Sequence, residues 1–269
     1  MPFLEALLLG LTQGLTEFIP VSSSGHLEIA RAVFQINFAA NFHIFLELIN
    51  IGTLLALLIF YRRKIWQIIL NIFQKHDFRL FLNLVITTIP AVIIGFTLGN
   101  LIEENPFFKS LAVIASAMAI VGVLMILLDR WTRFPHLQSL KNEAQLKPGH
   151  ALAIGLAQCF AFIPGVSRSG ATIIAGRIMG LNSASAADYS FLASIPIMFG
   201  VTLLSLVKHA SFVAQNLPFL AFANLVAFLS GLLALFVLLR ILHKPKTLQF
   251  FGWYRLVLAL AVFIFLFFH

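Results

Sequence analysis

Two short polar stretches interrupt an otherwise apolar chain, and they resemble each other. The stretch at 13–26 carries Glu17, a Phe-Ile-Pro break, three consecutive serines and a histidine. The stretch at 158–172 carries a second Phe-Ile-Pro break, followed by Arg168 between two serines. Both predict a short apolar helix, a Ser-x-Ser-Gly turn and a new helix. Ionisable side chains are costly inside a membrane segment, so these stretches are the first candidates for a functional site.

The first stretch places a carboxylate ahead of a helix that starts with hydroxyl groups. Gln13 and Glu17 are four residues apart on a helix and therefore share a face. A helix N-terminus attracts anions, phosphate above all, because its first N–H groups are unpaired and the helix dipole is positive there. His26 lies in the first turn of this second helix. The hydroxyl groups at its start belong to Ser22, Ser23 and Ser24.

The second stretch adds a permanent positive charge. Arg168 presents a planar fork of donors that suits phosphate oxygens. Together the two turns offer a cation, two helix N-termini, hydroxyls, a histidine and a carboxylate, a set that suits phosphoryl transfer. A hydroxyl that attacks phosphorus needs a base, and His26 or Glu17 can serve. Glu17, with Glu47, could instead hold a divalent ion that bridges phosphate oxygens. The substrate-binding candidates are Gln13, Ser22, Ser24, Glu47, Ser167, Ser169 and Thr172.

Structural roles compete with these functional ones. Ser22 and Ser24 can be helix caps, and Gln13 can simply hydrogen-bond a neighbouring helix. Glu17 and Arg168 are harder to explain by structure alone, because either one left unpaired costs roughly 3 kcal/mol at mid-bilayer. Their simplest structural role is to pair with each other.

The composition requires a membrane protein. Of the 269 residues, 60% are hydrophobic and 10% are charged, more apolar surface than a soluble domain can bury. Backbone groups in lipid must be satisfied within the chain and the apolar runs are long, so the fold class is an all-α polytopic bundle rather than a β-barrel. The net charge of +8 comes from basic clusters at the ends of apolar runs. We attribute it to membrane topology and expect no nucleic-acid partner.

Six segments are long enough to cross a bilayer, which takes roughly 20 residues. The predicted spans are 42–61, 81–102, 110–128, 188–207, 219–239 and 250–268. The remaining regions, 1–37 and 150–182, each hold two shorter apolar pieces around a polar turn, which favours two re-entrant helical hairpins. The whole chain is then one membrane domain of two halves, about 1–135 and about 150–269. Each half has an odd number of spans, so the halves form an inverted-topology repeat.

Basic loops set the expected orientation. Lysine and arginine cluster at 62–80, 129–149 and 240–249, which places these loops in the cytoplasm. The first hairpin then opens to the outer side and the second opens to the cytoplasm, with their tips meeting near the midplane.

At these motifs the chain resembles the undecaprenyl-diphosphatase family, the bacitracin-resistance type of integral membrane phosphatase. The family pattern has Glu or Gln four residues before Glu, then Pro-x-Ser-Ser-(Ser/Thr)-Gly-His and Pro-Gly-x-Ser-Arg-Ser-Gly-x-Thr. Here the pattern stands at Gln13, Glu17, 20–26 and 164–172. Gln13 occupies a place often held by Glu, which removes a charge and weakens any two-carboxylate metal site.

The resemblance implies hydrolysis of undecaprenyl diphosphate to undecaprenyl phosphate, which recycles the lipid carrier of peptidoglycan synthesis, and bacitracin resistance on overproduction. It implies Ser23 as the nucleophile, His26 and Glu17 as acid/base or positioning groups, and Arg168 as the phosphate clamp. It also implies a divalent cation, Mg²⁺ or Ca²⁺, and a bacterial cytoplasmic (inner) membrane location with the site open to the outer face. The residues alone do not choose Ser23 over its neighbouring serines. The oligomeric state stays open, with a homodimer among the alternatives.

The rival interpretation is a polyprenyl-phosphate flippase or transporter. Inverted repeats with broken helices are typical of transporters, and an anion site serves carriage as well as hydrolysis. Simple carriage requires neither Ser23 nor His26, so the nucleophile and base favour the enzyme.

Overall fold

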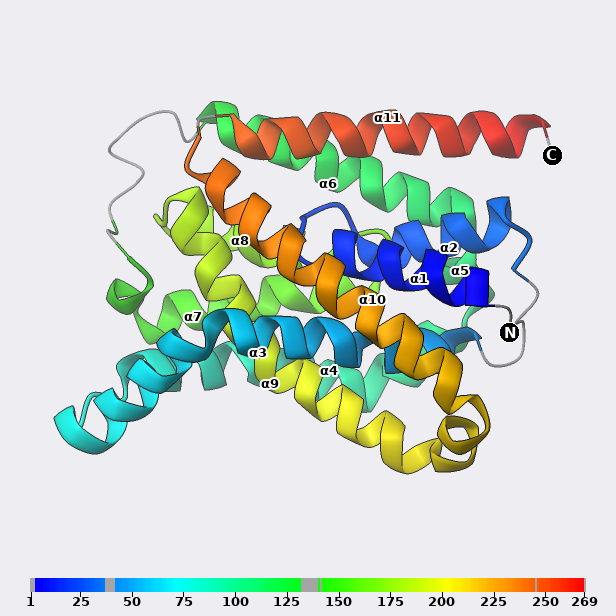
Figure 1. Ribbon diagram of the computed structural model, residues 1–269. Helices are drawn as coiled ribbons and strands as arrows, with labels where there is room; N and C mark the ends of the chain where they lie inside the picture. The colour runs from blue at the N-terminus through cyan, green and yellow to red at the C-terminus, as the bar shows by residue number, and fades with distance from the viewer. Residues whose placement is uncertain (1–2, 37–41, 132–139, 141, 245, 269) are drawn as a thin grey trace.

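The computed structural model is a bundle of helices, and it describes residues 3–36, 42–131, 140, 142–244 and 246–268 (Figure 1). The predicted end of the first half, near residue 135, lies outside the described residues. The helices in chain order are α1 (Phe3–Glu17), α2 (Ser23–Val33), α3 (Phe42–Lys75), α4 (Arg79–Glu104), α5 (Pro106–Lys109), α6 (Leu111–Trp131), α7 (Pro148–Cys159), α8 (Arg168–Ile178), α9 (Ser183–Lys208), α10 (Ala210–Leu242) and α11 (Thr247–Phe268). Short 3₁₀ turns lie at Glu143–Gln145 and Phe160–Phe162.

The six predicted spans are confirmed within the described residues. Six helices are long and apolar enough to cross a membrane, and they are α3, α4, α6, α9, α10 and α11. Two of them exceed the predicted spans by the largest margins. α3 continues to Lys75 instead of ending near 61, and α10 begins at Ala210 instead of 219, with Pro218 inside it. Helix hydrogen bonds are local, so a helix can continue into water after its apolar stretch ends.

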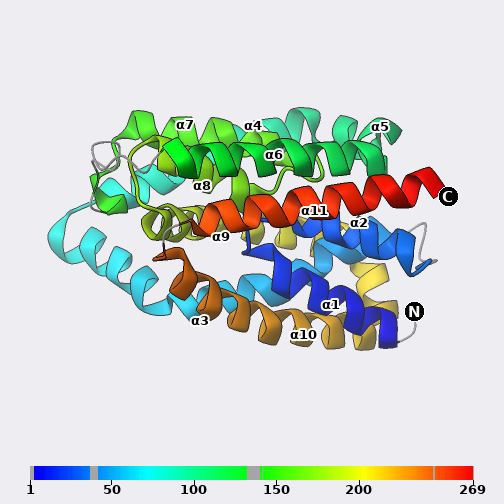
Figure 2. The same ribbon diagram turned by 90° about the horizontal axis from the view of Figure 1, so that it is seen from above.

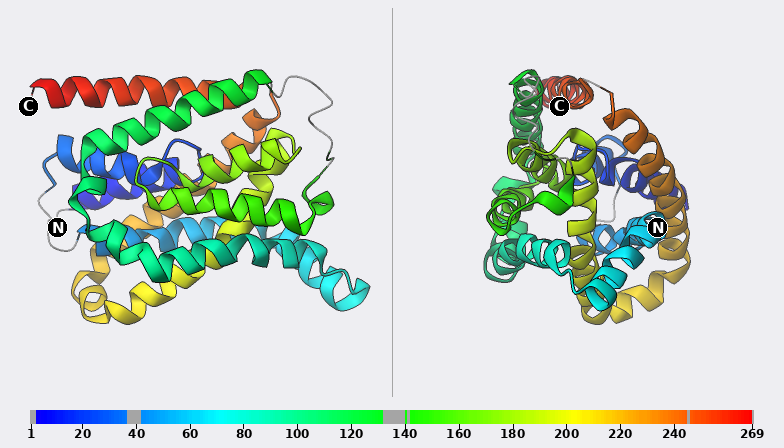
Figure 3. Two further views of the ribbon diagram at one scale, coloured as in Figure 1. Left: turned by 180° about the vertical axis from the view of Figure 1, so that it is seen from behind. Right: turned by 90° about the vertical axis from the view of Figure 1, so that its left-hand side faces the viewer.

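The two regions predicted as re-entrant hairpins each form a helix–turn–helix unit, α1–α2 and α7–α8. α1 begins at the end of the bundle that carries both chain termini, whereas α7 begins at the opposite end (Figures 1 and 3). Each first helix packs against a long helix from the other half of the chain: α1 lies along α10, and α7 lies along α4 (Figure 2). The halves are therefore interlocked, and the two turns meet inside the bundle.

Glycine makes the α1–α10 contact possible. A Cβ atom added at Gly14 would lie 2.0 Å from Ser230 Oγ and 2.5 Å from the Ala227 carbonyl oxygen of α10. The helices can approach this closely only because Gly14 has no side chain, as in other membrane helix pairs.

We expect Gly14→Ala to lower the free energy of unfolding by about 1–3 kcal/mol, because the added methyl group must push α1 away from α10. The matched control is Gly99→Ala on α4, where an added Cβ meets nothing within 4 Å. Thermal unfolding in detergent would show a lower midpoint for the first variant only. Equal midpoints would contradict the contact.

Candidate active site

The two turns share one backbone geometry. Ser22 and Ser167 both have a φ of 76°, an uncommon value for a residue other than glycine. Each caps the following helix: Ser22 Oγ accepts the Gly25 N–H at 3.3 Å, and Ser167 Oγ accepts the Gly170 N–H at 3.1 Å. The capping role considered for Ser22 is therefore present, and the same role applies to Ser167.

The catalytic candidates Ser23 and Arg168 occupy the same place in these two units. Each is the first helical residue after its capping serine, Ser23 in α2 and Arg168 in α8. The turns are thus alike in backbone and different in chemistry. One supplies a hydroxyl group and the other a guanidinium group.

Glu17 joins these two side chains. Ser23 Oγ donates to Glu17 Oε2 at 2.7 Å, and Arg168 Nη2 donates to Glu17 Oε1 at 2.5 Å. The ion pair considered above as a structural role therefore exists, but it also includes the hydroxyl group. The Arg168 side chain keeps 18% of its surface exposed and that of Glu17 keeps 11%, so the pair is partly accessible.

A buried amide fixes the carboxylate. Gln13, only 2% exposed, donates through Nε2 to Glu17 Oε2 at 3.0 Å and to Asn50 Oδ1 of α3 at 2.7 Å. Asn50 is a member of this network that the site prediction missed. Its signal in the sequence is an amide inside an apolar span, where polar side chains tend to bind other helices.

His26 lies one helical turn after Ser23, and its two ring nitrogens bond to other partners. Its Nδ1 donates to the Ser22 carbonyl oxygen at 2.7 Å, because a carbonyl can only accept. In the neutral ring Nε2 is then the acceptor, and it receives the hydroxyl proton of Tyr254 of α11 at 2.8 Å. The two rings stack with centroids 5.7 Å apart. Tyr254 is a second residue that the site prediction missed.

The other candidates divide into residues at the turns and residues apart from them. Ser169 Oγ donates weakly to the Ile19 carbonyl oxygen of the other turn at 3.5 Å, which links the turns directly. Thr172 is buried and donates to the Arg168 carbonyl oxygen at 2.8 Å, so its hydroxyl group faces the protein interior. Ser24 is exposed. Glu47 accepts from Ser205 of α9, and among the described residues it makes no hydrogen bond or ion pair with the turns.

Arg255 holds both turns in place, although its only signal in the sequence is a charge within a predicted span. Its side chain on α11 is fully buried at 0% exposure. It donates to the carbonyl oxygens of Pro20 in the first turn at 2.9 Å and of Val166 in the second turn at 2.9 Å. It also donates to the Gly165 carbonyl oxygen and, at 3.1 Å, to that of Met118 in α6. One guanidinium group therefore sets the distance between the two turns.

We expect Arg255→Met to lower the free energy of unfolding by about 3 kcal/mol, because several buried carbonyl oxygens lose their donor. The activity of the site should also fall at least about tenfold in the protein that remains folded. Without Arg255 the two turns no longer keep the same distance from each other. Thermal unfolding and turnover in detergent measure the two effects. The control is Arg240→Met at the exposed end of α10. A stable and fully active Arg255→Met protein would contradict this role.

The helix N-termini at the turns add positive potential. The N–H groups of Ser23 and Ser24, and those of Arg168 and Ser169, have no hydrogen-bond partner within the described part of the chain. Unpaired N–H groups at a helix start bind anions. Beside Arg168, these four N–H groups would favour a phosphate group.

Fold and site together define a polytopic helical membrane protein with a serine–carboxylate–guanidinium site between two helix–turn–helix units. The family model described as "Bacitracin resistance protein BacA" matches residues 6–261, so the chain belongs to that family.

Curated relatives cover nearly the whole chain. The protein named undecaprenyl-diphosphatase from Methanococcus maripaludis is 38% identical over 265 residues, which are 98% of this chain and 100% of the relative. The proteins of the same name from Nitrosomonas europaea and Clavibacter michiganensis are 37% and 36% identical. They cover 96% and 99% of this chain and 93% and 97% of their own lengths.

Proposed function

We propose that this protein is an integral membrane phosphatase that hydrolyses undecaprenyl diphosphate to undecaprenyl phosphate and inorganic phosphate. This activity would recycle the lipid carrier for cell-wall synthesis. The observation that carries the proposal is that Glu17 accepts from Ser23 at 2.7 Å and from Arg168 at 2.5 Å. A nucleophile, a base and a phosphate clamp are thus in direct contact. Family membership and the names of the relatives agree with this chemistry.

In the first chemical step the Ser23 oxygen attacks the terminal phosphorus atom. Glu17 takes the hydroxyl proton along the hydrogen bond that already joins them. The new bond joins the serine oxygen to phosphorus, and the bond from phosphorus to the bridging oxygen breaks. Undecaprenyl phosphate leaves as an anion and requires no proton. Arg168 and the free N–H groups of the two helix N-termini stabilise the charge on the non-bridging oxygens.

In the second step water hydrolyses the phosphoserine. The bond from the serine oxygen to phosphorus breaks, inorganic phosphate is released, and Ser23 recovers the proton held by Glu17. A base must take a proton from the water, and Nε2 of His26 can do so once the Tyr254 hydroxyl group rotates away. The imidazolium then releases this proton to bulk water, which restores the neutral ring. This division of roles gives the two acid/base candidates separate steps.

The divalent cation implied by the family resemblance stays a prediction. The described residues hold no cluster of three or more histidine, cysteine, aspartate or glutamate side chains that would cage a metal ion. Glu17 and Gln13 offer oxygen atoms, which suits Mg²⁺ or Ca²⁺, and Mg²⁺ commonly takes its other ligands from substrate phosphates and water. These two side chains would then hold an ion that arrives with the diphosphate. The bound ion would neutralise charge on the phosphate oxygens.

The membrane arrangement is part of the same proposal. We infer that α1–α2 and α7–α8 are re-entrant hairpins of an inverted repeat, because they enter from opposite ends and share the geometry of their capping serines. Arg62 and Arg63 follow the apolar stretch of α3, and the C-terminal part of α3 lies at the end of the bundle away from the chain termini. The positive-inside rule makes that end cytoplasmic and opens the α1–α2 side to the outer face of a bacterial inner membrane.

The test is phosphate release from a polyprenyl diphosphate by the purified protein in detergent, where no membrane separates two compartments. We expect turnover by the natural protein and a loss of about 10²–10³-fold in Glu17→Gln, which removes the base and the partner of Arg168. The control is Glu5→Gln on the same helix. A flippase would release no phosphate, so absence of turnover in the natural protein would contradict the proposal.

We expect Gln13→Glu to be tolerated, because it adds a carboxylate without removing one. If the ion lies beside Glu17, this variant should also need less Mg²⁺ for half-maximal activity, since the second carboxylate adds a charged ligand. A titration of activity against free Mg²⁺ measures this shift. An inactive Gln13→Glu together with an active Glu17→Gln would overturn the carboxylate assignment.

A further inference from the structure

A polar stripe on α2 runs from Ser24, the residue after Ser23 at the turn, towards the end of the bundle that carries the chain termini. Ser24 follows Ser23 directly, and Glu28 and Arg31 come four and seven residues after Ser24 on α2. Residues at these spacings share one helix face. With a rise of about 1.5 Å per residue, α2 carries this face roughly 15 Å away from the turn. Charged side chains are costly in an apolar bundle, so this stripe on a short helix is a candidate functional site.

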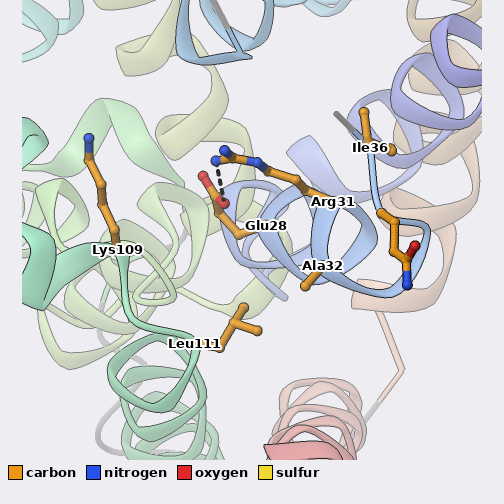
Figure 4. A pocket seen from close by; sticks show the side chains of 7 residues that line it. Glu28, Arg31, Ala32, Ile36, Lys109 and Leu111 are labelled. Atoms are coloured by element: carbon orange, nitrogen blue, oxygen red, sulfur yellow. Dashed lines mark ion pairs between the residues drawn. The ribbon is translucent and has the colours of Figure 1, made fainter. Parts of the chain in front are cut away.

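The stripe ends in a pocket of about 440 Å³, large enough for a phosphate ion with several waters, each of about 30 Å³. The pocket lies between the end of α2 and the chain where α5 leads into α6 (Figure 4). Its lining residues are Glu28, Arg31, Ala32, Gln35, Ile36, Lys109 and Leu111.

The charged side chains of the pocket favour binding of an anion, and the carboxylate among them keeps this binding weak. Arg31 pairs with Glu28 at 3.6 Å and lies over the Phe42 ring at 4.7 Å, so its guanidinium group is held in place. Lys109 faces them from the other side and has no ion-pair partner among the described residues. Two cations against one carboxylate leave one net positive charge. A site on a release path must bind weakly enough to let its ligand go.

We propose that this pocket, here called the outer phosphate site, binds a phosphate group as it passes between Ser23 and water. The inference rests on the proposed function for the source of that group. The group is either the inorganic phosphate that leaves or the diphosphate head of the arriving lipid. Arg31 and Lys109 bind the oxygens, and Glu28 limits the affinity. After hydrolysis the phosphate would therefore move from Ser23 to this weaker site and from there into water.

The first arm measures binding of labelled inorganic phosphate by equilibrium dialysis and requires no turnover. All proteins carry Arg168→Gln, which removes the clamp of the catalytic site. We expect binding to persist in that background and to weaken about tenfold on adding Arg31→Gln and Lys109→Gln. Glu28→Gln should strengthen it about threefold, because a repulsive charge is lost. The control pair, Lys75→Gln and Lys208→Gln, removes two exposed cations elsewhere and should leave binding unchanged.

The sign of the Glu28→Gln effect separates an anion site from a structural cluster, since loss of a structural ion pair would weaken binding. Absence of phosphate binding in the Arg168→Gln background, or equal binding in all variants, would overturn the proposal. Because this arm contains no hydrolysis, its result does not depend on whether the protein is a phosphatase.

The second arm uses proteins with Arg168 intact and distinguishes the two sources. If the site serves the leaving phosphate, Arg31→Gln with Lys109→Gln weakens inhibition by inorganic phosphate and leaves KM for polyprenyl diphosphate unchanged. If it serves the lipid head group, the same pair raises KM. No change in either quantity would overturn a role on the reaction path.

Discussion

Ser23→Ala should lower kcat for polyprenyl diphosphate hydrolysis by about 10⁴-fold, equivalent to roughly 5.5 kcal/mol of transition-state stabilisation. The reason is geometric. Ser23 is the serine whose hydroxyl group donates to Glu17, whereas Ser22 caps α2 and Ser24 is exposed. Rapid quenching with labelled substrate should trap a phosphoserine in the natural protein and none in Ser23→Ala.

The matched control is Ser116→Ala, which removes an exposed hydroxyl group on α6 that bonds only to the Ala112 carbonyl oxygen of its own helix. Its kcat should be unchanged. If Ser23→Ala costs only about tenfold and no phosphoenzyme is trapped, Glu17 activates water directly. Ser23 would then be a positioning residue, and the two-step mechanism would be wrong.

Arg168→Lys should lower kcat by about 10³-fold although it keeps the positive charge. A lysine ammonium group is a point charge and cannot reproduce the planar fork that holds two oxygens at once. In this site one nitrogen of the fork already bonds to Glu17, so the others are the ones that can reach phosphate. A single lysine ammonium group could not bond to the Glu17 carboxylate and hold the substrate phosphate in the same geometry.

Steady-state kinetics in detergent measure this effect, with Arg130→Lys at the exposed end of α6 as the control. The loss should appear in kcat more than in KM, because the fork acts on charge that develops in the transition state. Near-normal turnover of Arg168→Lys would mean that charge alone is sufficient and that the helix N-termini orient the phosphate.

The long helices could be predicted because their signal is local. A run of about 20 apolar residues must span the bilayer whatever its neighbours are. The ends were less predictable: α3 runs to Lys75 because backbone hydrogen bonds continue where hydropathy stops. The two turns were also local, because a serine before a Ser-Ser-Gly or Arg-Ser-Gly sequence caps its own helix.

The sequence by itself determined the six spans, the two matching turns and the set of reactive groups, because each depends on residues close together in the chain. Only the tertiary structure decided which groups meet. Glu17 contacts Arg168 from the other half, Asn50 supports Gln13, and Tyr254 covers His26. Arg255 ties both turns to α11. These contacts join residues far apart in the sequence. They are fixed by the packing between helices, and hydropathy and residue spacing do not encode that packing.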